Sequence, residues 1–435
     1  MSKKKKAALE PRFRFPEFRE RGNWEIGTLG DIANKVTERN QNNSINRVLT
    51  NSAVNGVIDQ SDYFYREVAN KNNLDNYFVV NEGDYVYNPR ISATAPVGPV
   101  SKNKIGEGVM SPLYTIIRFE SHNNDFYEHY FRTNLWHRYL RNVSNTGARN
   151  DRLSISNDDF MNIPIALPSL DEQQKIADCL ASLDELINAG EKKLALLKTH
   201  KKGLMQKLFP AEGKTTPEVR FKGYTEAWRQ RKFNNVFDYS ISNNTFSRSE
   251  LNYEGGKVKN IHYGDILTKF GSCVDVQHES IPFITNGNVD DYKNRLLQDG
   301  DIVFADTAED EITGKAIEIA NIQDSKIVAG LHTMAYRPRI KISSYFSGYY
   351  FNSQSYRKQL LPLMQGIKVL SLNKSSLSKT ETFIPISPDE QAAIGNFFKN
   401  LDKQITAQTK KIEALKIHKK GLMQGLFPSI EEAGG

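Results

Sequence analysis

The chain contains one stretch of sequence twice. Residues 171–210 align without a gap on residues 389–428, which start 218 positions later, and 22 of the 40 aligned positions are identical. A weaker repeat opens each half, because residues 11–29 and 217–233 share a Pro-x-x-Arg-Phe start followed by a tryptophan and an apolar residue. A period this long indicates two related domains rather than a solenoid of short repeats.

Composition narrows the classes of protein that are compatible with this duplication. With 435 residues, 39% hydrophobic and 25% charged, the chain can bury about two ordinary cores, one for each repeat. Its apolar stretches are far shorter than the roughly 18 residues of a membrane span, and the N-terminus lacks the apolar run of a signal peptide. Cys179 and Cys273 stand in neither a disulfide framework nor a zinc-ligand spacing. We therefore expect a cytoplasmic protein, and its net charge of +7 favours a polyanionic partner.

Both copies of the repeat begin with the signal of a helix start. Ser169 precedes Glu172 and Ser387 precedes Glu390 in the Ser-x-x-Glu spacing, in which the serine caps a free amide while the glutamate reaches back to the cap. Pro388 occupies an early position where a missing amide costs nothing. A Phe-Pro pair ends each copy, so the sequence predicts helices over residues 169–210 and 387–428.

Apolar residues in these helices recur in alternating steps of four and three. They are Ile176, Leu180, Leu183, Ile187, Leu194, Leu197, Leu204 and Leu208 in the first copy, and Ile394, Phe398, Leu401, Ile405, Ile412, Leu415, Leu422 and Leu426 in the second. A 3.5-residue period held this long predicts a left-handed coiled coil along this seam.

Each helix is the natural partner of the other. Only residues 211–216 separate the end of the first helix from the second domain, and that domain runs directly into the second helix at Ser387. A parallel pair would force the domain to span roughly 60 Å. We therefore predict an antiparallel coiled coil with pseudo-twofold duplication, although a plain dimerisation rod would give the same seam.

The regions between the helices read as short β-rich runs broken by Asn, Gly, Asp and Ser. Both contain a Gly-Asp turn before an alternating strand, at residues 82–87 and 299–304, and they diverge elsewhere. The predicted fold class is α+β, with two mixed α/β domains separated by the two long helices. The expected boundaries are 1–19 (basic flexible segment), 20–168 (first domain), 169–210 (helix), 211–386 (second domain), 387–428 (helix) and 429–435 (tail).

Loops of both domains carry residue types suited to DNA. Arginine and lysine pair with guanine or phosphate, and asparagine pairs with adenine, although in loops these residues are commonly only solvated turn formers. The candidate DNA contacts are Arg39, Asn42, Arg47, Arg149, Asn150 and Arg152 in the first domain, and Lys257, Lys259, Asn286, Asn288, Lys293 and Arg295 in the second.

Catalytic constellations are missing from the sequence. Asn88-Pro89-Arg90 departs from the Asn-Pro-Pro-aromatic motif of amino-methyltransferases, and no glycine-rich cofactor or nucleotide loop is found. The acidic run at 306–311 reads as a solvated loop rather than a metal site. His200 and His418 occupy matched positions beside lysines, where a charge near a helix C-terminus is the simpler role. We therefore predict no catalytic residue, no metal site and no cofactor bound by this chain.

The duplicated Asp-Glu-Gln helix that ends in Lys-Lys-Gly-Leu-Met-Gln-x-Leu-Phe-Pro resembles the specificity subunit of a type I restriction-modification system. The resemblance covers nearly the whole length, with the family's conserved helices at 169–210 and 387–428. It implies that the two mixed α/β domains, 20–168 and 211–386, are target-recognition domains. It implies a non-catalytic reader of double-stranded DNA that assembles with two methyltransferase subunits and two restriction subunits. Those partners would supply S-adenosylmethionine, ATP and magnesium chemistry. Each domain would read one half of a split target, with the coiled coil setting the gap and docking the methyltransferase subunits.

Two alternatives belong to other functional classes. A fused methyltransferase or nuclease would need the cofactor and catalytic motifs that the sequence lacks. A structural adaptor with protein-binding end domains would need only the coiled coil and the domains.

Overall fold

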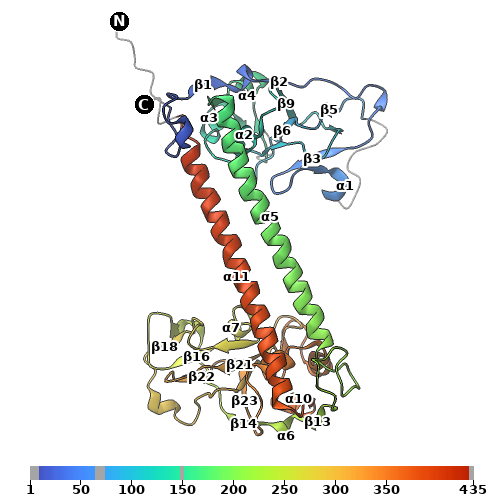
Figure 1. Ribbon diagram of the computed structural model, residues 1–435, viewed down its shortest axis with the longest axis vertical. Coiled ribbons are helices and arrows are strands. Elements are labelled where there is room, and N and C mark those ends of the chain that lie inside the picture. Colours follow the sequence, from blue (N-terminus) through green and yellow to red (C-terminus); the bar gives the residue numbers. More distant parts are fainter. Residues whose placement is uncertain (1–8, 64–73, 147–150, 431–435) are drawn as a thin grey trace. The chain divides into compact units, whose positions relative to one another are not determined.

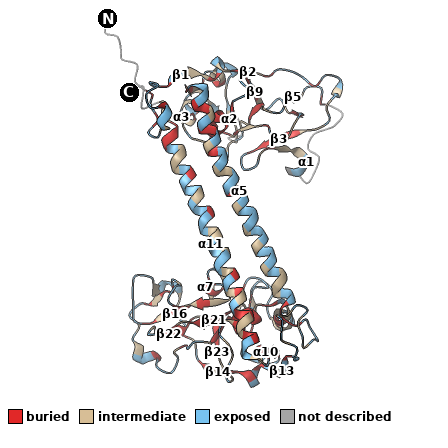
Figure 2. Ribbon diagram, in the orientation of Figure 1, coloured by how far each residue is buried: buried red, intermediate tan, exposed pale blue. Residues whose placement is uncertain are grey.

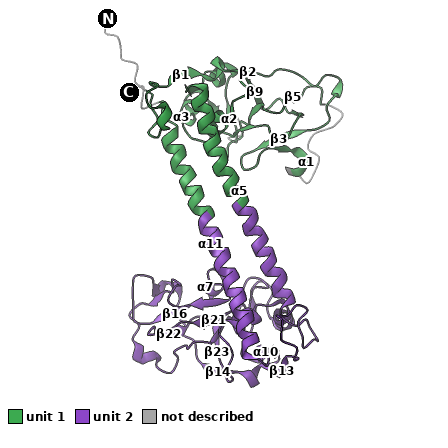
Figure 3. Ribbon diagram, viewed as in Figure 1, with its two compact units in different colours: residues 1–189, 412–435 green, residues 190–411 purple. Residues whose placement is uncertain are grey.

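A computed structural model describes residues 9–63, 74–146 and 151–430 of the chain. It divides into two compact units: unit 1 comprises residues 1–189 and 412–435, and unit 2 comprises residues 190–411 (Figure 3). The division crosses both long helices, so each unit contains one of the two globular domains, the start of one helix and the end of the other. Among the helices of the described residues, none carries an apolar stretch long enough to cross a lipid bilayer.

The described strands of unit 1 form small antiparallel sheets. The largest has the order β2-β9-β6-β7, and the pairs β1-β12, β3-β4, β5-β8 and β10-β11 flank it. The strands are β1 (Glu25–Thr28), β2 (Ala33–Lys35), β3 (Leu49–Ser52), β4 (Gly56–Asp59), β5 (Phe78–Val80), β6 (Tyr85–Tyr87), β7 (Val100–Lys102), β8 (Gly108–Met110), β9 (Thr115–Phe119), β10 (Asn145–Thr146), β11 (Leu153–Ser154) and β12 (Pro164–Leu167). The helices are α1 (Gln60–Tyr63), α2 (Asp125–Phe131), α3 (His137–Val143), α4 (Asn157–Met161) and the first half of α5 (Leu170–Lys207) (Figure 1).

Unit 2 repeats the central strand order and extends it by one strand. Its first sheet runs β14-β23-β19-β21-β17, its second runs β15-β18-β16-β22, and β13-β25 and β20-β24 form separate pairs. The strands are β13 (Arg229–Lys232), β14 (Phe237–Ile241), β15 (Leu251–Asn252), β16 (Lys259–Ile261), β17 (Cys273–Asp275), β18 (Phe283–Ile284), β19 (Ile302–Ala305), β20 (Thr307–Ala308), β21 (Ala316–Ala320), β22 (Ile327–Ala329), β23 (Thr333–Pro338), β24 (Leu370–Ser371) and β25 (Glu381–Ile384). The helices are α6 (Phe233–Val236), α7 (Tyr263–Thr268), α8 (Phe346–Phe351), α9 (Gln354–Leu360), α10 (Lys374–Ser378) and α11 (Pro388–Leu426), which ends in unit 1.

The Gly-Asp turn predicted in each domain holds the central sheet together. Gly83 and Gly300 have φ angles of 91° and 88°, a conformation that favours glycine. The aspartate that follows each glycine is buried and accepts two hydrogen bonds from an arginine on the neighbouring strand. Arg118 donates to Asp84 at 2.7 and 2.8 Å, and Arg337 on β23 donates to its aspartate at 2.9 and 2.7 Å.

The predicted helices are confirmed, with ends a few residues inside the expected ones, and every seam residue is buried or half-buried (Figure 2). In unit 2 the two helices run antiparallel, since residue numbers rise along α5 as they fall along α11. Gln408 donates to the carbonyl of Gly190 at 3.2 Å, and Lys201 pairs with Asp402 at 2.5 Å. In unit 1, Lys419 of α11 pairs with Asp184 of α5 at 2.5 Å.

The glutamates at the two helix starts do not form the expected capping boxes. Glu172 is buried, and its carboxylate accepts hydrogen bonds from Arg14 at 2.8 and 2.9 Å. Glu390 is equally buried, and its carboxylate accepts hydrogen bonds from Arg220 at 2.6 and 2.8 Å. The arginine of each Pro-x-x-Arg-Phe segment thus neutralises a buried carboxylate at the start of a long helix, and a paired buried charge is far less costly than an isolated one.

The ends of the long helices are buried among aromatic side chains. Phe209 stacks on Phe398 with ring centroids 5.9 Å apart, and Phe427 lies 5.1 Å from Phe126. Residues 9–19 are also packed, because Leu9 and Phe18 are buried and the amide of Phe13 donates to the carbonyl of Gly425 at 2.8 Å. The flexible segment expected through residue 19 is therefore wrong for residues 9–19, whereas residues 1–8 and 431–435 lie outside the described part.

Candidate nucleic-acid interface

The structure separates arginines that serve the fold from arginines that remain available to a ligand. Arg14, Arg118, Arg220 and Arg337 each bind one buried carboxylate with two nitrogens. This fork geometry is the strongest arrangement that a guanidinium makes with a carboxylate. An arginine held in this way has its donors occupied, so a DNA contact is better sought among arginines without such a partner.

By this criterion Arg47 is held by the fold, whereas Arg39 and Asn42 remain available for a DNA contact. Arg47 donates to both oxygens of Asp59 at 2.9 and 2.8 Å, and these bonds lower the pKa of that carboxyl. Its remaining nitrogen reaches the carbonyl of Ile105 at 2.5 Å, so the structure assigns Arg47 to the fold. Arg39 is exposed and lies over the ring of Phe78 at 4.6 Å. Asn42 is exposed on the same loop, with a φ angle of 61°.

The third group of candidates in this domain is only partly described. Arg149 and Asn150 lie outside the described residues, whereas Arg152 forms an antiparallel bridge with Arg90. Arg90 was not among the sequence candidates, since the sequence drew attention to it only as a departure from a methyltransferase motif. The bridge between Arg90 and Arg152 joins residues far apart in the sequence, so no local sequence pattern predicts it.

The candidates in the second domain come from one sheet and the loop that follows it. Lys259 lies on β16 opposite Phe283 of β18, and its ammonium donates to the carbonyl of Val276 at 3.1 Å. The other five are exposed, and they lie beside β16 or between β18 and residue 296: Lys257, Asn286, Asn288, Lys293 and Arg295. Lys293 pairs with Asp290 at 2.8 Å, an exposed ion pair that a phosphate can displace at little cost. The structure therefore brings these residues to one region, and their contact with DNA stays a prediction.

A second polar surface lies on the long helices themselves. In the C-terminal half of each copy of the repeat, six polar residues are identical and exposed in both: Lys192, Lys193, Lys198, His200, Lys202 and Gln206 on α5, matched by Lys410, Lys411, Lys416, His418, Lys420 and Gln424 on α11. Exposed side chains contribute little to packing, so burial does not explain why these positions match. We refer to these twelve residues as the repeated surface.

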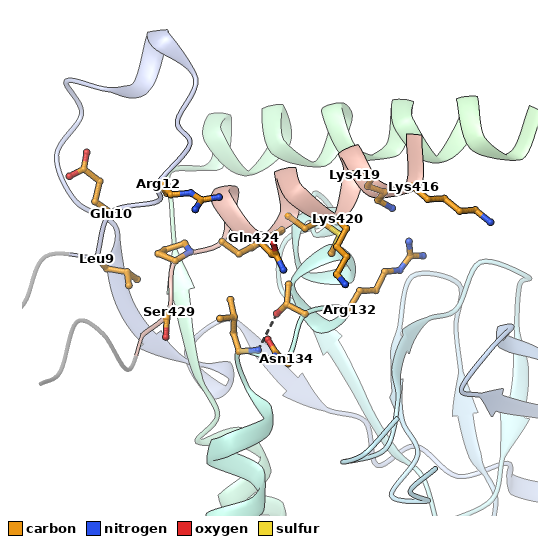
Figure 4. A pocket seen from close by; sticks show the side chains of 15 residues that line it. Leu9, Glu10, Arg12, Arg132, Asn134, Lys416, Lys419, Lys420, Gln424 and Ser429 are labelled. Carbon is orange, nitrogen blue, oxygen red and sulfur yellow. Dashed lines mark hydrogen bonds between the residues drawn. The ribbon is translucent and has the colours of Figure 1, made fainter. Parts of the chain in front are cut away.

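In unit 1 part of the repeated surface lines a cavity of ≈ 810 Å³. Lys420 and Gln424 extend from α11 toward the turn that carries Arg132 and Asn134, with Arg12 on the other side (Figure 4). The lining contains five cations but only one carboxylate, which belongs to Glu10, and its cations are Arg12, Arg132, Lys416, Lys419 and Lys420. Arg132 and Lys419 are paired with carboxylates outside the lining, and the other three cations still outnumber the one carboxylate of the lining, so the cavity favours an anionic group.

Two cations of this lining belong to a partly buried polar cluster. Asp184 accepts from Arg132 at 3.1 Å as well as from Lys419, and Arg132 also pairs with Glu128 at 2.6 Å. Burial lowers the pKa of His129 to about 4, an effect that the neighbouring cations reinforce, so this imidazole is neutral at pH 7. The cluster fixes the α5–α11 contact and leaves no acid–base group poised at the cavity.

The described residues show no metal centre, since no group of three histidine, cysteine, aspartate or glutamate side chains is placed to hold an ion. Burial raises the pKa of the Glu318 carboxyl to about 7. Its oxygens accept from the amides of Tyr345 and Gly348 at 2.6 and 2.9 Å, so it has a structural role.

Comparison with known proteins finds one family and its members. The family described as type I restriction modification DNA specificity domain matches residues 21–199 and 225–416. The type I restriction enzyme MjaVIII specificity subunit of Methanocaldococcus jannaschii is 29% identical over 277 residues, which cover 62% of each protein and thus less than two thirds of that relative. The putative MjaX specificity subunit of the same organism is 24% identical over 432 residues, 93% of this chain and 92% of the relative.

The fold is also similar to that of a solved structure. The crystal structure of a type I restriction-modification system S subunit from M. genitalium matches with a TM-score of 0.55 at 12% sequence identity, covering 97% of this chain and 99% of that one.

Proposed function

Because this chain belongs to the type I restriction-modification DNA specificity family, we propose that each of its two recognition domains reads one half of a bipartite duplex target. The chain is a DNA sequence-specificity subunit, the role after which its relatives are named, and is not itself an enzyme.

One observation supports the bipartite reading most directly. The two units share the strand order of the central sheet and the same Asp–Arg clamp, formed by Asp84 and Arg118 in unit 1 and by Asp301 and Arg337 in unit 2. Their exposed loops carry different side chains. Since side chains at base edges specify sequence, a shared framework with unlike loops suits two readers of unlike half-sites.

The repeated surface supports two copies of one partner. Identical exposed side chains on two helices can be contacted in the same way by two identical proteins, and we propose that these are the methyltransferase subunits. The cations of the repeated surface and of the cavity in unit 1 favour an acidic patch on that partner. Two restriction subunits complete the proposed assembly, and the partners use S-adenosylmethionine, ATP and magnesium in the cytoplasm.

The long helices are the proposed spacer. The seam residues and the antiparallel contacts within unit 2 fit an antiparallel coiled coil that fixes the distance between the two half-sites. The proposed pseudo-twofold relation of the copies matches the local dyad of duplex DNA.

Exchange of domains tests the bipartite reading. Replacing residues 228–386 by the corresponding domain of another family member should change one half of the methylated sequence and leave the other half and the gap unchanged. Mapping methylated adenines in cells that carry the complete system measures this. A folded, active complex in which both half-sites change would contradict independent reading, and a wild-type complex that binds DNA without sequence preference would favour a structural adaptor.

The partner surface has its own test. Lys202→Glu should remove one methyltransferase copy from the assembly, Lys420→Glu the other, and the double change both, as measured by native mass spectrometry. Lys403→Glu is the matched control, because Lys403 is exposed on α11 and is not repeated on α5, where Glu185 stands. Full assembly of the double variant would show that the repeated surface is not the docking site.

A further inference from the structure

Two arginines of unit 1 stand directly opposite each other on a short antiparallel ladder. Arg90 follows β6, Arg152 precedes β11, and the two residues form an isolated bridge. The amide of Ile91 donates to the carbonyl of Asp151 at 3.0 Å, and the amide of Leu153 donates to that of Pro89 at 3.0 Å. Hydrogen bonds that flank a pair in this way leave its members in the closer of the two cross-strand spacings, with both side chains on one face.

This arrangement does not help the domain to fold. Like charges directly opposite each other destabilise a strand pair. Among the described residues Arg152 has no ion-pair partner. The ion-pair partner of Arg90 is Asp151 at 3.5 Å, and the side chain of Arg90 is 62% exposed and that of Asp151 37% exposed. By contrast, Arg47 and Arg118 of the same unit each hold a carboxylate with two nitrogens. The backbone therefore places the two arginines side by side, and among the described residues neither guanidinium is bound to a carboxylate through two nitrogens.

Unit 2 has the corresponding ladder but different side chains. The chain that leaves β19 forms β20, which pairs with β24, with Thr307 opposite Ser371 and Ala308 opposite Leu370. In both units the second strand of the ladder leads into a short capped helix, α4 after β11 and α10 after β24. The framework is thus the same, but the paired cations of unit 1 are replaced by hydroxyl and apolar side chains.

We infer that Arg90 and Arg152 form a guanine-reading pair for the half-site bound by the first recognition domain. This inference rests on the proposed function. A two-stranded ribbon fits the major groove, where the fork of an arginine bonds bidentately to O6 and N7 of guanine. Backbone pairing at both sides of the bridge holds the two forks in register, so they address neighbouring positions. The unit 2 ladder lacks this chemistry, so the pair also makes the two half-sites unlike.

Replacing arginine by lysine separates base reading from phosphate contact. Lysine keeps the charge, and with it most of a phosphate contact, but loses the bidentate fork. The probe is a randomised duplex library bound by the full chain in complex with its methyltransferase subunits. The variant R90K/R152K should lose its preference for guanine at up to two positions of one half-site, by about 5-fold to 100-fold at each position. The other half-site and the gap should stay the same.

The control R19Q/R141Q removes two exposed arginines of the same unit and should leave every base preference unchanged. The variant R90Q/R152Q should lose the same guanine preference while its thermal unfolding midpoint stays equal or rises, because a like-charge pair is removed. Uniform weakening without a change in base preference, or a wild-type half-site that contains no guanine, would overturn the inference. If the wild-type complex shows no bipartite preference at all, the proposed function fails first, and the two failures are thereby distinguished.

Discussion

Lengthening both long helices by one heptad should move the two half-sites apart. Seven residues inserted after Gly190 and seven after Gln408 fall within a few positions of the boundary between the two units. The ion pairs Lys201–Asp402 in unit 2 and Lys419–Asp184 in unit 1 then stay within their own units. A whole heptad also keeps every apolar residue on the seam.

The magnitude follows from helix and DNA geometry. Seven residues add about 10 Å of helix at 1.5 Å per residue, equal to about 3 base pairs at 3.4 Å per pair. The preferred gap should therefore lengthen by up to about 3 base pairs with both half-site sequences unchanged. Three added base pairs also rotate one half-site about the DNA axis by about 100° relative to the other. One added heptad, by contrast, rotates the apolar seam only slightly about the helix axis. Affinity at the new gap should therefore be lower than that of the wild-type complex at its own gap.

Mapping methylated adenines in cells that carry the variant measures the gap directly. Two controls accompany it: a heptad in one helix only, which puts the paired helices out of register, and four residues in both helices, which rotate the seam. Both controls should lose methylation or folding. A folded and active double-heptad variant that still methylates only the original spacing would refute the idea that the helices set the distance.

Three further predictions concern stability and activity. Glu390→Gln breaks the buried pair with Arg220 and should lower the free energy of unfolding of unit 2 by about 3–5 kcal/mol. Urea unfolding followed by the fluorescence of the adjacent Trp228 measures this loss. The control Asp389→Asn, at an exposed position, should change the free energy of unfolding little. Burial raises the pKa of Glu318 from 4.5 to about 7, so the folded state keeps a proton that the unfolded state releases between about pH 4.5 and 7. The stability of unit 2 should therefore fall by up to about 3 kcal/mol as pH rises through that window, and an equal slope in Glu318→Gln would rule this carboxyl out. The purified chain alone should not turn over S-adenosylmethionine, and turnover in a preparation free of methyltransferase would contradict its non-catalytic role.

Sequence reasoning was most reliable where periodicity or repetition carried the signal. The helices at 170–207 and 388–426, the buried or half-buried seam and the Gly-Asp turn were predictable, because each depends on spacing within a few residues. The capping boxes failed for a tertiary reason. Glu172 and Glu390 are the right residues for a cap, but arginines 158 and 170 positions away in the sequence bind their carboxylates instead.

The candidate DNA contacts also show the difference between what the sequence predicts and what tertiary contacts decide. Arg47 and Arg152 look alike in sequence, since both are arginines in polar segments. Only the fold shows that the first is held by Asp59, whereas the second lies opposite Arg90 and has no ion-pair partner among the described residues. Whether an arginine is available depends on which side chains the folded backbone brings within about 4 Å of it, and loops carry no period from which this can be read.

The sequence by itself therefore determined the duplication, the long helices with their seam, and the family. These features are encoded in repeated positions along the chain, where local geometry and hydrophobic spacing suffice. Only the tertiary structure decided where the Pro-x-x-Arg-Phe segments bind, which half of each helix belongs to which unit, and which cations are paired with carboxylates. Those outcomes depend on contacts between residues far apart in sequence, and each contact is set by competition among partners that only the folded chain brings together.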